Sequence, residues 1–133
     1  MITLDTSGLL ALANRRDPDH ERSRVALTQD RGPYVVPAGI LAEITYMLEH
    51  RLGLAVLELF LDDLISGAYT LDCGLDDFPR VRELVRQYAD LPLGFADAAV
   101  VACAERSGGQ VLTLDRRDFG VVARAGKLTL LPE

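Results

Sequence analysis

The sequence predicts a single α/β domain, residues 1–133, built on a parallel β-sheet of about five strands with helices on both faces. Three observations support this prediction. Short apolar segments of strand character alternate along the chain with longer segments of helical periodicity. A length of 133 residues, of which 49% are apolar, is enough to bury one full core. The chain also shows no linker, low-complexity tract or internal repeat that would divide it.

The chain opens with a strand followed by two helices. Residues 2–5 have the pattern of a short strand, and residues 9–13 continue as an apolar helical segment. Asp17 is expected to cap a second helix, with Pro18 at its first helical position, because proline is well tolerated there. This helix is expected to continue to about residue 30. Its apolar residues are sparse, which is typical of a helix with little buried surface.

The middle of the chain repeats the same alternation. Residues 34–36 predict the second strand, and the spacing of apolar residues predicts a helix over about 38–51. A strongly apolar helix follows over residues 54–65. The third strand is expected at residues 68–71. Two strands joined through helices in this way indicate parallel pairing.

The last third completes the sheet. Asp76 or Asp77 is expected to cap a helix that ends before Pro92. A helix over residues 94–105 is apolar nearly all round, which indicates burial on every side. The final two strands are expected at residues 111–114, running on into residues 115–119, and at residues 127–131.

The charge balance bears on which partners are expected. The chain has a net charge of −6, and thirteen of its fourteen basic residues are arginine. Proteins that bind nucleic acid usually present a basic surface, so a negative chain is an unusual partner for a polyanion. Bound divalent cations and nearby arginines would offset this charge at a site. The charge therefore counts against nucleic-acid binding without excluding it.

Composition further predicts a cytoplasmic protein with no membrane association. The longest apolar run covers residues 98–104, far below the ~20 residues needed to cross a bilayer, and the start of the chain lacks a signal-peptide pattern. Cys73 and Cys103 lie in apolar surroundings without metal-ligand spacing, so both are expected to be buried free thiols. His20 and His50 occupy polar helix positions and are expected at the surface.

Four acidic residues are predicted to meet at one edge of the sheet. Asp5 ends the first strand and Asp115 the fourth, so their carboxylates emerge together if these strands are neighbours. Asp97 opens the helix that leads into the fourth strand, which brings the start of that helix to the same edge. Glu43 lies at the border of the apolar stripe of its helix and can reach the edge from there.

This convergence points to a metal site. Taken singly, each acid has an ordinary explanation as a helix cap, a turn residue or a solvated flank. Together they would repel, since two charges ~5 Å apart cost roughly 3 kcal/mol at an effective dielectric constant of ~20. Either the carboxyl groups share protons or divalent cations bind among them. We favour a cation, and Mg²⁺ or Mn²⁺ suits an all-oxygen set of ligands.

Several short motifs resemble the PIN domain family, in particular the VapC-type ribonuclease toxins of prokaryotic toxin–antitoxin pairs. The similarity spans nearly the whole chain and includes the segment Asp17-Pro18-Asp19-His20-Glu21. The order and spacing of the motifs are more specific than any one of them. The other motifs are Leu4-Asp5-Thr6-Ser7, Ala42-Glu43-Ile44, Phe95-Ala96-Asp97-Ala98 and Leu112-Thr113-Leu114-Asp115-Arg116-Arg117-Asp118-Phe119.

The resemblance implies hydrolysis of an RNA phosphodiester that depends on Mg²⁺ or Mn²⁺. It implies a catalytic quartet of acids, of which the three aspartates would be the metal ligands: Asp5, Glu43, Asp97 and Asp115. It also implies four supporting residues, Thr6, Ser7, Thr113 and the additional acid Asp118. Four arginines adjoin the site in sequence and could hold RNA phosphates, because a guanidinium matches a phosphate in bidentate geometry: Arg15, Arg16, Arg116 and Arg117.

The same resemblance implies a homodimer and a cognate antitoxin protein that occupies the active groove. The apolar helices from about residue 38 to 66 could supply such an interface, although the same residues could equally form core. One alternative stays open. A chain of this fold could act as a non-catalytic protein-binding module, against which the four acids argue.

Overall fold

The computed structural model describes residues 1–72, 74–91, 93–125 and 128–133. Its strands are β1 (Ile2–Leu4), β2 (Tyr34–Pro37), β3 (Thr70–Asp72), β4 (Gln110–Leu112) and β5 (Thr129–Leu131). Its α-helices are α1 (Thr6–Ala13), α2 (His20–Thr28), α3 (Leu41–Leu52), α4 (Leu54–Ser66), α5 (Phe78–Gln87), α6 (Phe95–Arg106) and α7 (Arg116–Arg124). Two short 3₁₀ helices, η1 (Ala38–Ile40) and η2 (Leu75–Asp77), precede α3 and α5.

The five strands form one parallel sheet in the order β3-β2-β1-β4-β5. The central strand β1 pairs with β2 through Thr3 opposite Val35 and with β4 through Leu4 opposite Leu112. The first and fourth strands are therefore neighbours, as the predicted acidic site requires. The α/β fold class and the five-stranded parallel sheet are both confirmed.

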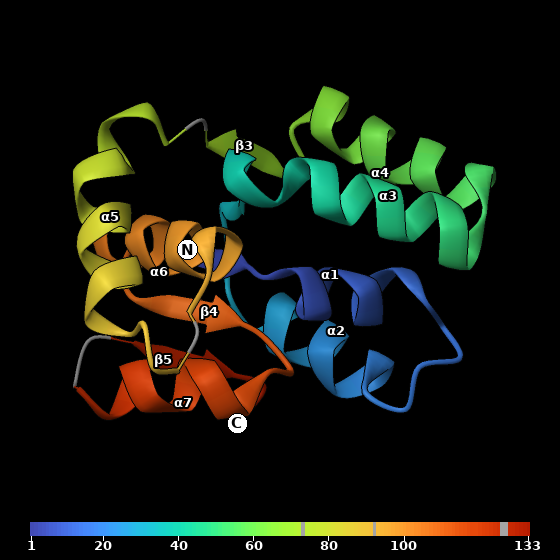
Figure 1. Ribbon diagram of the computed structural model, residues 1–133. Coiled ribbons are helices and arrows are strands. Elements are labelled where there is room, and N and C mark those ends of the chain that lie inside the picture. Colours follow the sequence, from blue (N-terminus) through green and yellow to red (C-terminus); the bar gives the residue numbers. More distant parts are fainter. Residues whose placement is uncertain (73, 92, 126–127) are drawn as a thin grey trace.

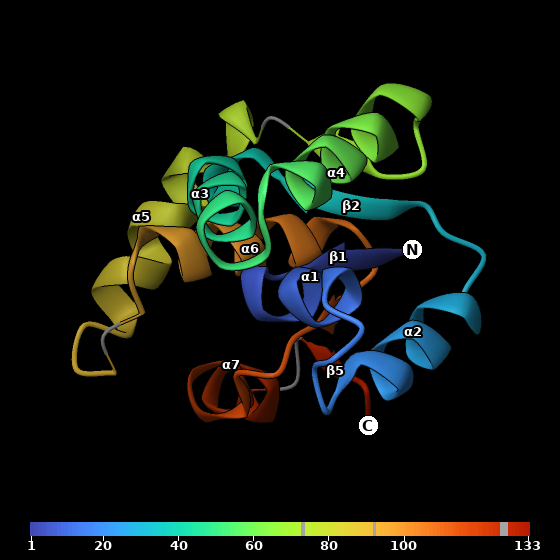
Figure 2. The same ribbon diagram turned by 90° about the vertical axis from the view of Figure 1, so that its right-hand side faces the viewer.

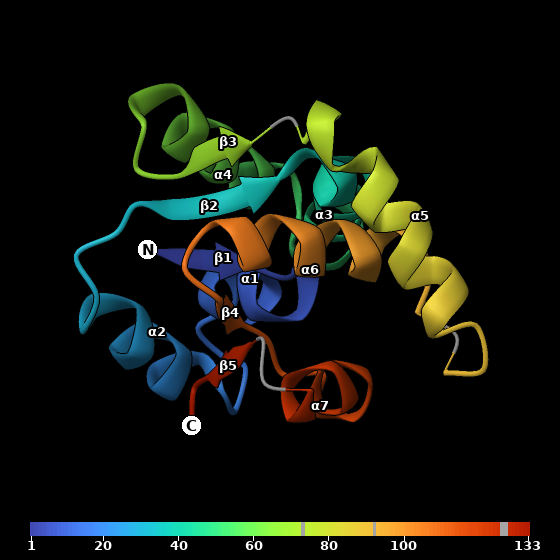
Figure 3. The same ribbon diagram turned by 90° about the vertical axis from the view of Figure 1, so that its left-hand side faces the viewer.

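Helices cover the two faces of the sheet (Figure 1). Helices α1, α3 and α4 lie over one face, which is turned toward the viewer in Figure 2. Helix α6 runs across the opposite face, with α5 beside it, as Figure 3 shows. This sandwich explains why α6 is apolar all round: Ala98, Val100, Val101 and Ala104 are fully buried.

One glycine permits the close approach of α1 to β4. A Cβ atom on Gly8 would lie 2.4 Å from the carbonyl oxygen of Leu112, a distance that no side chain tolerates. The missing side chain therefore lets the first turn of α1 rest directly on the end of β4. Because of this contact, residues near position 6 face residues near position 113.

The second helix begins later than expected. Asp17 does not cap it. Its carboxylate instead accepts the amide N–H of Asp19 at 2.8 Å, which closes a turn before α2 starts at His20. His20 is also not a free surface residue, because its Nδ1 lies 2.8 Å from the carbonyl oxygen of Ala11 and joins α2 to α1.

Two further predictions about helices were wrong. Residues 115–119 do not continue a strand: they open α7, whose buried face carries Phe119 and Val122. Neither Asp76 nor Asp77 caps α5 with its side chain, and the carboxylate of Asp77 pairs with Arg106 instead. Long-range ion pairing here replaces a local capping bond.

The remaining differences are small. The third strand lies at Thr70–Asp72 and the fourth at Gln110–Leu112, each shifted by one or two residues from its expected position. Cys103 is a buried free thiol, as expected. The predictions that fall on Cys73, Pro92 and Lys127 lie outside the described residues. Within the described ranges, every helix is too short or too polar to span a bilayer.

Candidate metal-binding active site

The candidate site lies where β1 and β4 end, at the carboxyl edge of the sheet. Asp5 follows β1 directly, and its amide N–H donates to the carbonyl oxygen of Leu112 at 3.1 Å. This bond extends the pairing of the two strands by one residue and places Asp5 beside the segment that leads to Asp115. The neighbouring strands thus bring together residues that are more than 100 positions apart.

Asp5 lies at the base of this site. Its side chain is buried, with 5% of the residue exposed, and one carboxylate oxygen accepts both the Ser7 and Thr113 hydroxyls, each at 2.8 Å. Burial raises the pKa of Asp5, because the ionised form loses hydration, while the two hydroxyl donors act in the opposite direction. The two hydroxyl groups therefore replace part of the hydration that the Asp5 carboxylate loses on burial.

The same two hydroxyls order the turn after β4. The Ser7 oxygen accepts the amide N–H of Leu114 at 2.9 Å, and the Thr113 oxygen accepts that of Asp115 at 3.0 Å. Each hydroxyl carries a single proton, which it donates to Asp5. The 3.1 Å contact between the two hydroxyl oxygens is therefore a close approach imposed by their shared acceptor.

Three further carboxylates gather near Asp5. Asp97 lies in the first turn of α6, Asp115 at the N-cap of α7 and Asp118 in the first turn of α7. One oxygen from each of the three lies within 4.8 Å of the others. Asp118 also donates its amide N–H to the Asp115 carboxylate at 3.4 Å, which links the two acids through the helix cap.

The electrostatics of Asp97 reflect this crowding. Burial raises the pKa of Asp97 to about 6, and the negative charges of Asp5, Asp115, Asp118 and Glu43 act in the same direction. All four neighbours therefore favour the neutral form of Asp97 when no cation is present. A cation among the carboxylates would remove the cause of this repulsion.

The donor set suits a hard divalent cation. Asp97, Asp115 and Asp118 offer carboxylate oxygens only, converging from the starts of two helices, and such ligands are the ones that Mg²⁺ and Mn²⁺ prefer. Asp5 is not one of these three converging carboxylates, and its side chain is held by the Ser7 and Thr113 hydroxyls. The cluster found among the described residues thus includes Asp118, for which the sequence had implied only a supporting role.

The other predicted residues take more peripheral positions. Glu43 is exposed on α3 and acts on Asp97 through its charge. The hydroxyl of Thr6 is buried and has no hydrogen-bond partner within the described part of the chain, so Ser7 is the residue whose hydroxyl supports Asp5. Four arginines are exposed beside the first and last helices: Arg15, Arg16, Arg116 and Arg117.

Sequence reasoning missed α7, although a signal for it was present. Asp115 followed by Phe119 and Val122 has the spacing of a capped helix with one buried face. Sequence reasoning also missed the two exposed phenylalanines, Phe78 and Phe95, that begin α5 and α6. Their rings lie near each other only because the two helices pack together.

Comparison with known proteins agrees with this geometry. The PIN domain family profile matches residues 2–125. The chain is 33% identical to Ribonuclease VapC26 of Mycobacterium tuberculosis (strain ATCC 25618 / H37Rv), over 97% of this chain and 98% of that protein.

Two solved structures share the fold. The first is that of Mycobacterium tuberculosis VapC20, described as a Sarcin-Ricin loop cleaving toxin, with a TM-score of 0.79, 20% identity, and coverage of 96% of this chain and 97% of that one. The second is FitAcB from Neisseria gonorrhoeae, with a TM-score of 0.63, 19% identity, and coverage of 98% and 96%. With a parallel sheet in which β1 and β4 are neighbours, acids at its carboxyl edge and a family match over nearly its full length, the chain belongs to the PIN domain family, among its VapC-type members.

Proposed function

We propose that this protein is a metal-dependent endoribonuclease and the toxin of a toxin–antitoxin pair. The observation that carries this proposal is the cluster of Asp97, Asp115 and Asp118 carboxylates at the carboxyl edge of the sheet. The similarity to Ribonuclease VapC26 supports RNA as the substrate. We also propose that the protein acts in the cytoplasm, where RNA is translated.

The acidic residues are proposed to bind the metal ion. Asp97, Asp115 and Asp118 would hold Mg²⁺ or Mn²⁺. Asp5, whose charge acts on Asp97, is proposed as a further ligand. When bound, such an ion polarises a phosphate and supplies a hydroxide at neutral pH. The carboxylates would hold the ion and its water and need not act as nucleophiles.

The remaining predicted residues complete the site. Ser7 and Thr113 orient Asp5 through their hydroxyl groups, and Glu43 adds negative charge from α3. Arg116 and Arg117, exposed at the start of α7, lie close in sequence to two of the acids and are proposed to bind RNA phosphates. Arg15 and Arg16 are proposed to do the same from the turn after α1.

We also propose that the toxin is a homodimer and that its antitoxin covers an apolar surface on α4. Leu54, Leu59 and Ile65 are 60%, 62% and 84% exposed on this helix. A cavity of about 210 Å³ next to Leu59 is also lined by Leu12, Leu48, Phe60 and Tyr69, among others. Apolar side chains exposed next to a groove are typical of a protein interface.

The test is cleavage of a labelled structured RNA with Mg²⁺, with Mn²⁺ and with a chelator. Wild-type protein is expected to cut only with a divalent ion. Asp97→Asn and Asp5→Asn are expected to lower the rate by on the order of 100-fold, because each removes a charge that holds the ion. Asp62→Asn, a substitution on the exposed surface of α4, is the matched control and should cut at the wild-type rate.

Two results would contradict the proposal. Undiminished cleavage by both Asp97→Asn and Asp5→Asn would move the active site elsewhere. Failure of the wild-type protein to cut any of several RNAs, together with tight binding of a partner protein, would favour the non-catalytic module.

A further inference from the structure

A second cavity, of about 350 Å³, adjoins the acidic site on the side of α1. Ser7 belongs to both, because it lines the cavity and its hydroxyl donates to Asp5 at 2.8 Å. Leu114 also lines the cavity, donates its amide N–H to the Ser7 hydroxyl at 2.9 Å and immediately precedes Asp115. Ser7 and Leu114 thus place the cavity directly beside the Asp5 side of the site.

The rest of the lining is partly apolar and partly polar. Two further leucines, Leu10 and Leu52, are half-buried in the wall. The polar groups come from the C-cap of α1, the turn before α2 and the last turn of α3: Asn14, Asp17 and Arg51. A cavity of this size, with an apolar lining and a few polar groups, is typical of a site for a small ligand or for one unit of a polymer.

The turn that carries Asn14 and Asp17 is ordered by its own hydrogen bonds. The Asn14 carbonyl accepts the amide N–H of Asp17 at 3.0 Å, and its side-chain oxygen accepts that of Arg16 at 3.1 Å. Oδ1 of Asp17 accepts the amide N–H of Asp19 at 2.8 Å, and His20 joins the end of the turn to α1. The motif that begins at Asp17 thus forms a rim whose shape does not depend on a ligand.

These bonds leave particular groups available to a ligand. Asn14 uses its side-chain oxygen within the turn, so its NH₂ group keeps both donors. Oδ2 of Asp17 accepts no hydrogen bond from another described residue, so it keeps its acceptor capacity. The rim therefore offers donors together with one charged acceptor.

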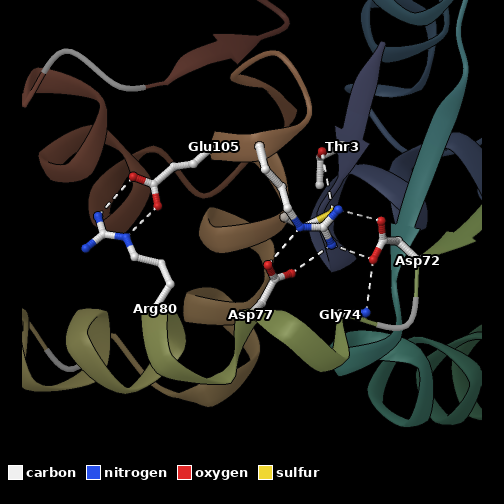
Figure 4. A network of polar contacts seen from close by, with 8 residues as sticks. Thr3, Asp72, Gly74, Asp77, Arg80 and Glu105 are labelled. Carbon is white, nitrogen blue, oxygen red and sulfur yellow. Dashed lines mark hydrogen bonds and ion pairs between the residues drawn. The ribbon is translucent and has the colours of Figure 1, made fainter.

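Arg51 supplies the positive charge of the cavity. Figure 4 shows, by contrast, arginines that carboxylates hold in place: Arg80 donates from Nε to Glu105 at 2.8 Å. Arg106 likewise donates from Nε to Asp77 at 2.8 Å. Arg51 is exposed and forms no ion pair with another described residue. Its guanidinium is therefore available to an anionic ligand.

A ribonucleotide matches this combination of groups. Its phosphate accepts hydrogen bonds from a guanidinium, which can bind it in bidentate geometry, and from the NH₂ group of Asn14. Its 2′-hydroxyl is a donor that the Asp17 carboxylate can accept, and deoxyribose lacks it. The apolar faces of the sugar and base suit the leucines. An anion without a hydroxyl group matches less well, because Asp17 repels it.

We propose that this cavity is a subsite for the ribonucleotide next to the scissile phosphate, with the phosphate of that nucleotide on Arg51 and Asn14 and its 2′-hydroxyl on Asp17. The inference rests on the proposed ribonuclease function and assigns to it a group that holds RNA and one that distinguishes RNA from DNA. Without a cation, the acids of the metal site repel a phosphate chain. The subsite supplies attraction outside that cluster.

The first experiment measures RNA binding in chelator, where a metal-dependent nuclease does not cut. Protein is titrated into a labelled, random-sequence single-stranded RNA and followed by fluorescence anisotropy. Arg51→Gln should weaken binding about 10- to 150-fold, the range for a lost hydrogen bond to a charged group. It should also lower the slope of log K against log salt by about 0.7, the value for one phosphate of a single strand.

Arg86→Gln is the matched control. Arg86 is also exposed, lies in the last turn of α5 and forms no ion pair with another described residue. The two substitutions therefore remove the same charge from the same kind of helix position. Arg86→Gln should bind RNA as the wild type does.

The second experiment measures the preference for ribose. Single-stranded DNA should bind about 10-fold more weakly than RNA, because one hydrogen bond to a charged acceptor is lost. Asp17→Asn keeps an oxygen for the Asp19 amide but removes the charge that faces the 2′-hydroxyl, so the preference should shrink. Asp62→Asn, on the exposed surface of α4, should keep the full preference.

Cleavage kinetics separate the subsite from the ribonuclease function. Arg51→Gln should raise KM and leave kcat nearly unchanged, because Arg51 is not among the proposed metal ligands. Cleavage that depends on Asp97, with equal KM for Arg51→Gln and wild type, would overturn the subsite and leave the function standing. RNA binding that depends on Arg51, without cleavage of any RNA, would do the reverse.

Three other outcomes would also overturn the subsite. They are an absence of RNA binding by the wild type, equal binding of RNA and DNA, and an equal loss of binding in Arg51→Gln and Arg86→Gln. The last of these would show an effect of net charge and not of one site. Circular dichroism of each variant verifies that the fold is intact.

Discussion

At the scale of single residues, the site combines one buried carboxylate with three more accessible ones. Asp5 receives both available hydroxyl protons from Ser7 and Thr113. Among the described residues, no hydroxyl group donates a hydrogen bond to the Asp97 carboxylate, which instead lies near other negative charges. Hydrogen bonding thus stabilises the charge of Asp5, whereas Asp97 experiences a repulsion that a bound cation would relieve.

Asp97→Asn is expected to stabilise the metal-free protein above about pH 6. Because the pKa of Asp97 is raised from 3.8 to about 6, the folded state holds this proton more tightly than the unfolded chain. The free energy of unfolding of the metal-free wild type should therefore fall as the pH rises through this interval. With allowance for solvent screening, Asp97→Asn should gain about 1–2 kcal/mol over wild type at pH 7.

Urea unfolding of both proteins in chelator, from pH 4 to pH 7.5, measures this difference. The gain should shrink toward pH 4, because only below the unfolded-state pKa of 3.8 is Asp97 protonated in both states. A difference that does not change with pH would show that charge repulsion is not its cause.

Thr113→Val is expected to weaken both the fold and the metal site. The substitution keeps the volume but removes the donor to Asp5 and the acceptor of the Asp115 amide. A buried group left without its partner costs about 1–3 kcal/mol, and loss of a group that orients a ligand lowers metal affinity about 10- to 100-fold. Urea unfolding and calorimetric titration with Mg²⁺ measure the two effects.

Thr3→Val is the matched control for this change. Thr3 is as buried as Thr113. Its hydroxyl donates only a weak hydrogen bond, to the Cys103 sulfur at 4.0 Å, and not to a carboxylate of the proposed metal site. Mg²⁺ affinity should be unchanged in this variant. Equal Mg²⁺ affinities for Thr113→Val and Thr3→Val would remove Thr113 from the site.

At the scale of elements, the contact between α1 and β4 sets the geometry of the site. The first turn of α1 carries Ser7, and β4 leads into Thr113, so the two hydroxyls meet only when helix and strand touch. Gly8 allows this contact because its Cα faces the carbonyl of Leu112. The first turn of α7 likewise brings the amide N–H of Asp118 to the carboxylate of Asp115.

Gly8→Ala is expected to destabilise the protein by about 2 kcal/mol or more, because the new methyl group meets a fixed backbone carbonyl. Alanine is otherwise the better helix former, so the clash must outweigh a gain of about 1 kcal/mol. Gly120→Ala in α7 is the control, since the nearest atom to its Cβ is 3.9 Å away at the tip of Arg124. That variant should be neutral or slightly stabilised in urea unfolding, and a similar loss in both would argue against the clash.

At the scale of the whole molecule, the site joins the two ends of the chain. Asp5 comes from the first strand, Asp97 from the sixth helix, and Asp115 and Asp118 from the seventh. Opening any of these elements would separate the four carboxylates. A bound cation should therefore stabilise the fold as a whole and not one local segment.

Mg²⁺ is expected to raise the Tm of the wild-type protein. At 100 times its Kd, the ion contributes about 2.7 kcal/mol, a rise of roughly 10 °C for a domain of this size. Asp115→Asn should show little of this rise, whereas Asp62→Asn should show all of it. Differential scanning calorimetry in chelator and in MgCl₂ measures both, and an equal rise in the two variants would place the ion elsewhere.

Local periodicity and short motifs were enough to predict the fold class and the position of most strands, and to single out the acids that we propose for the site. Tertiary packing was needed to place β1 beside β4, to bring Asp118 to Asp97 and Asp115, and to let Ser7 and Thr113 share Asp5. The packing of α5 and α6 also brings the rings of Phe78 and Phe95 close together beside a cavity. These are contacts between residues far apart in the chain, and they form only when helices and strands pack, which no local pattern encodes.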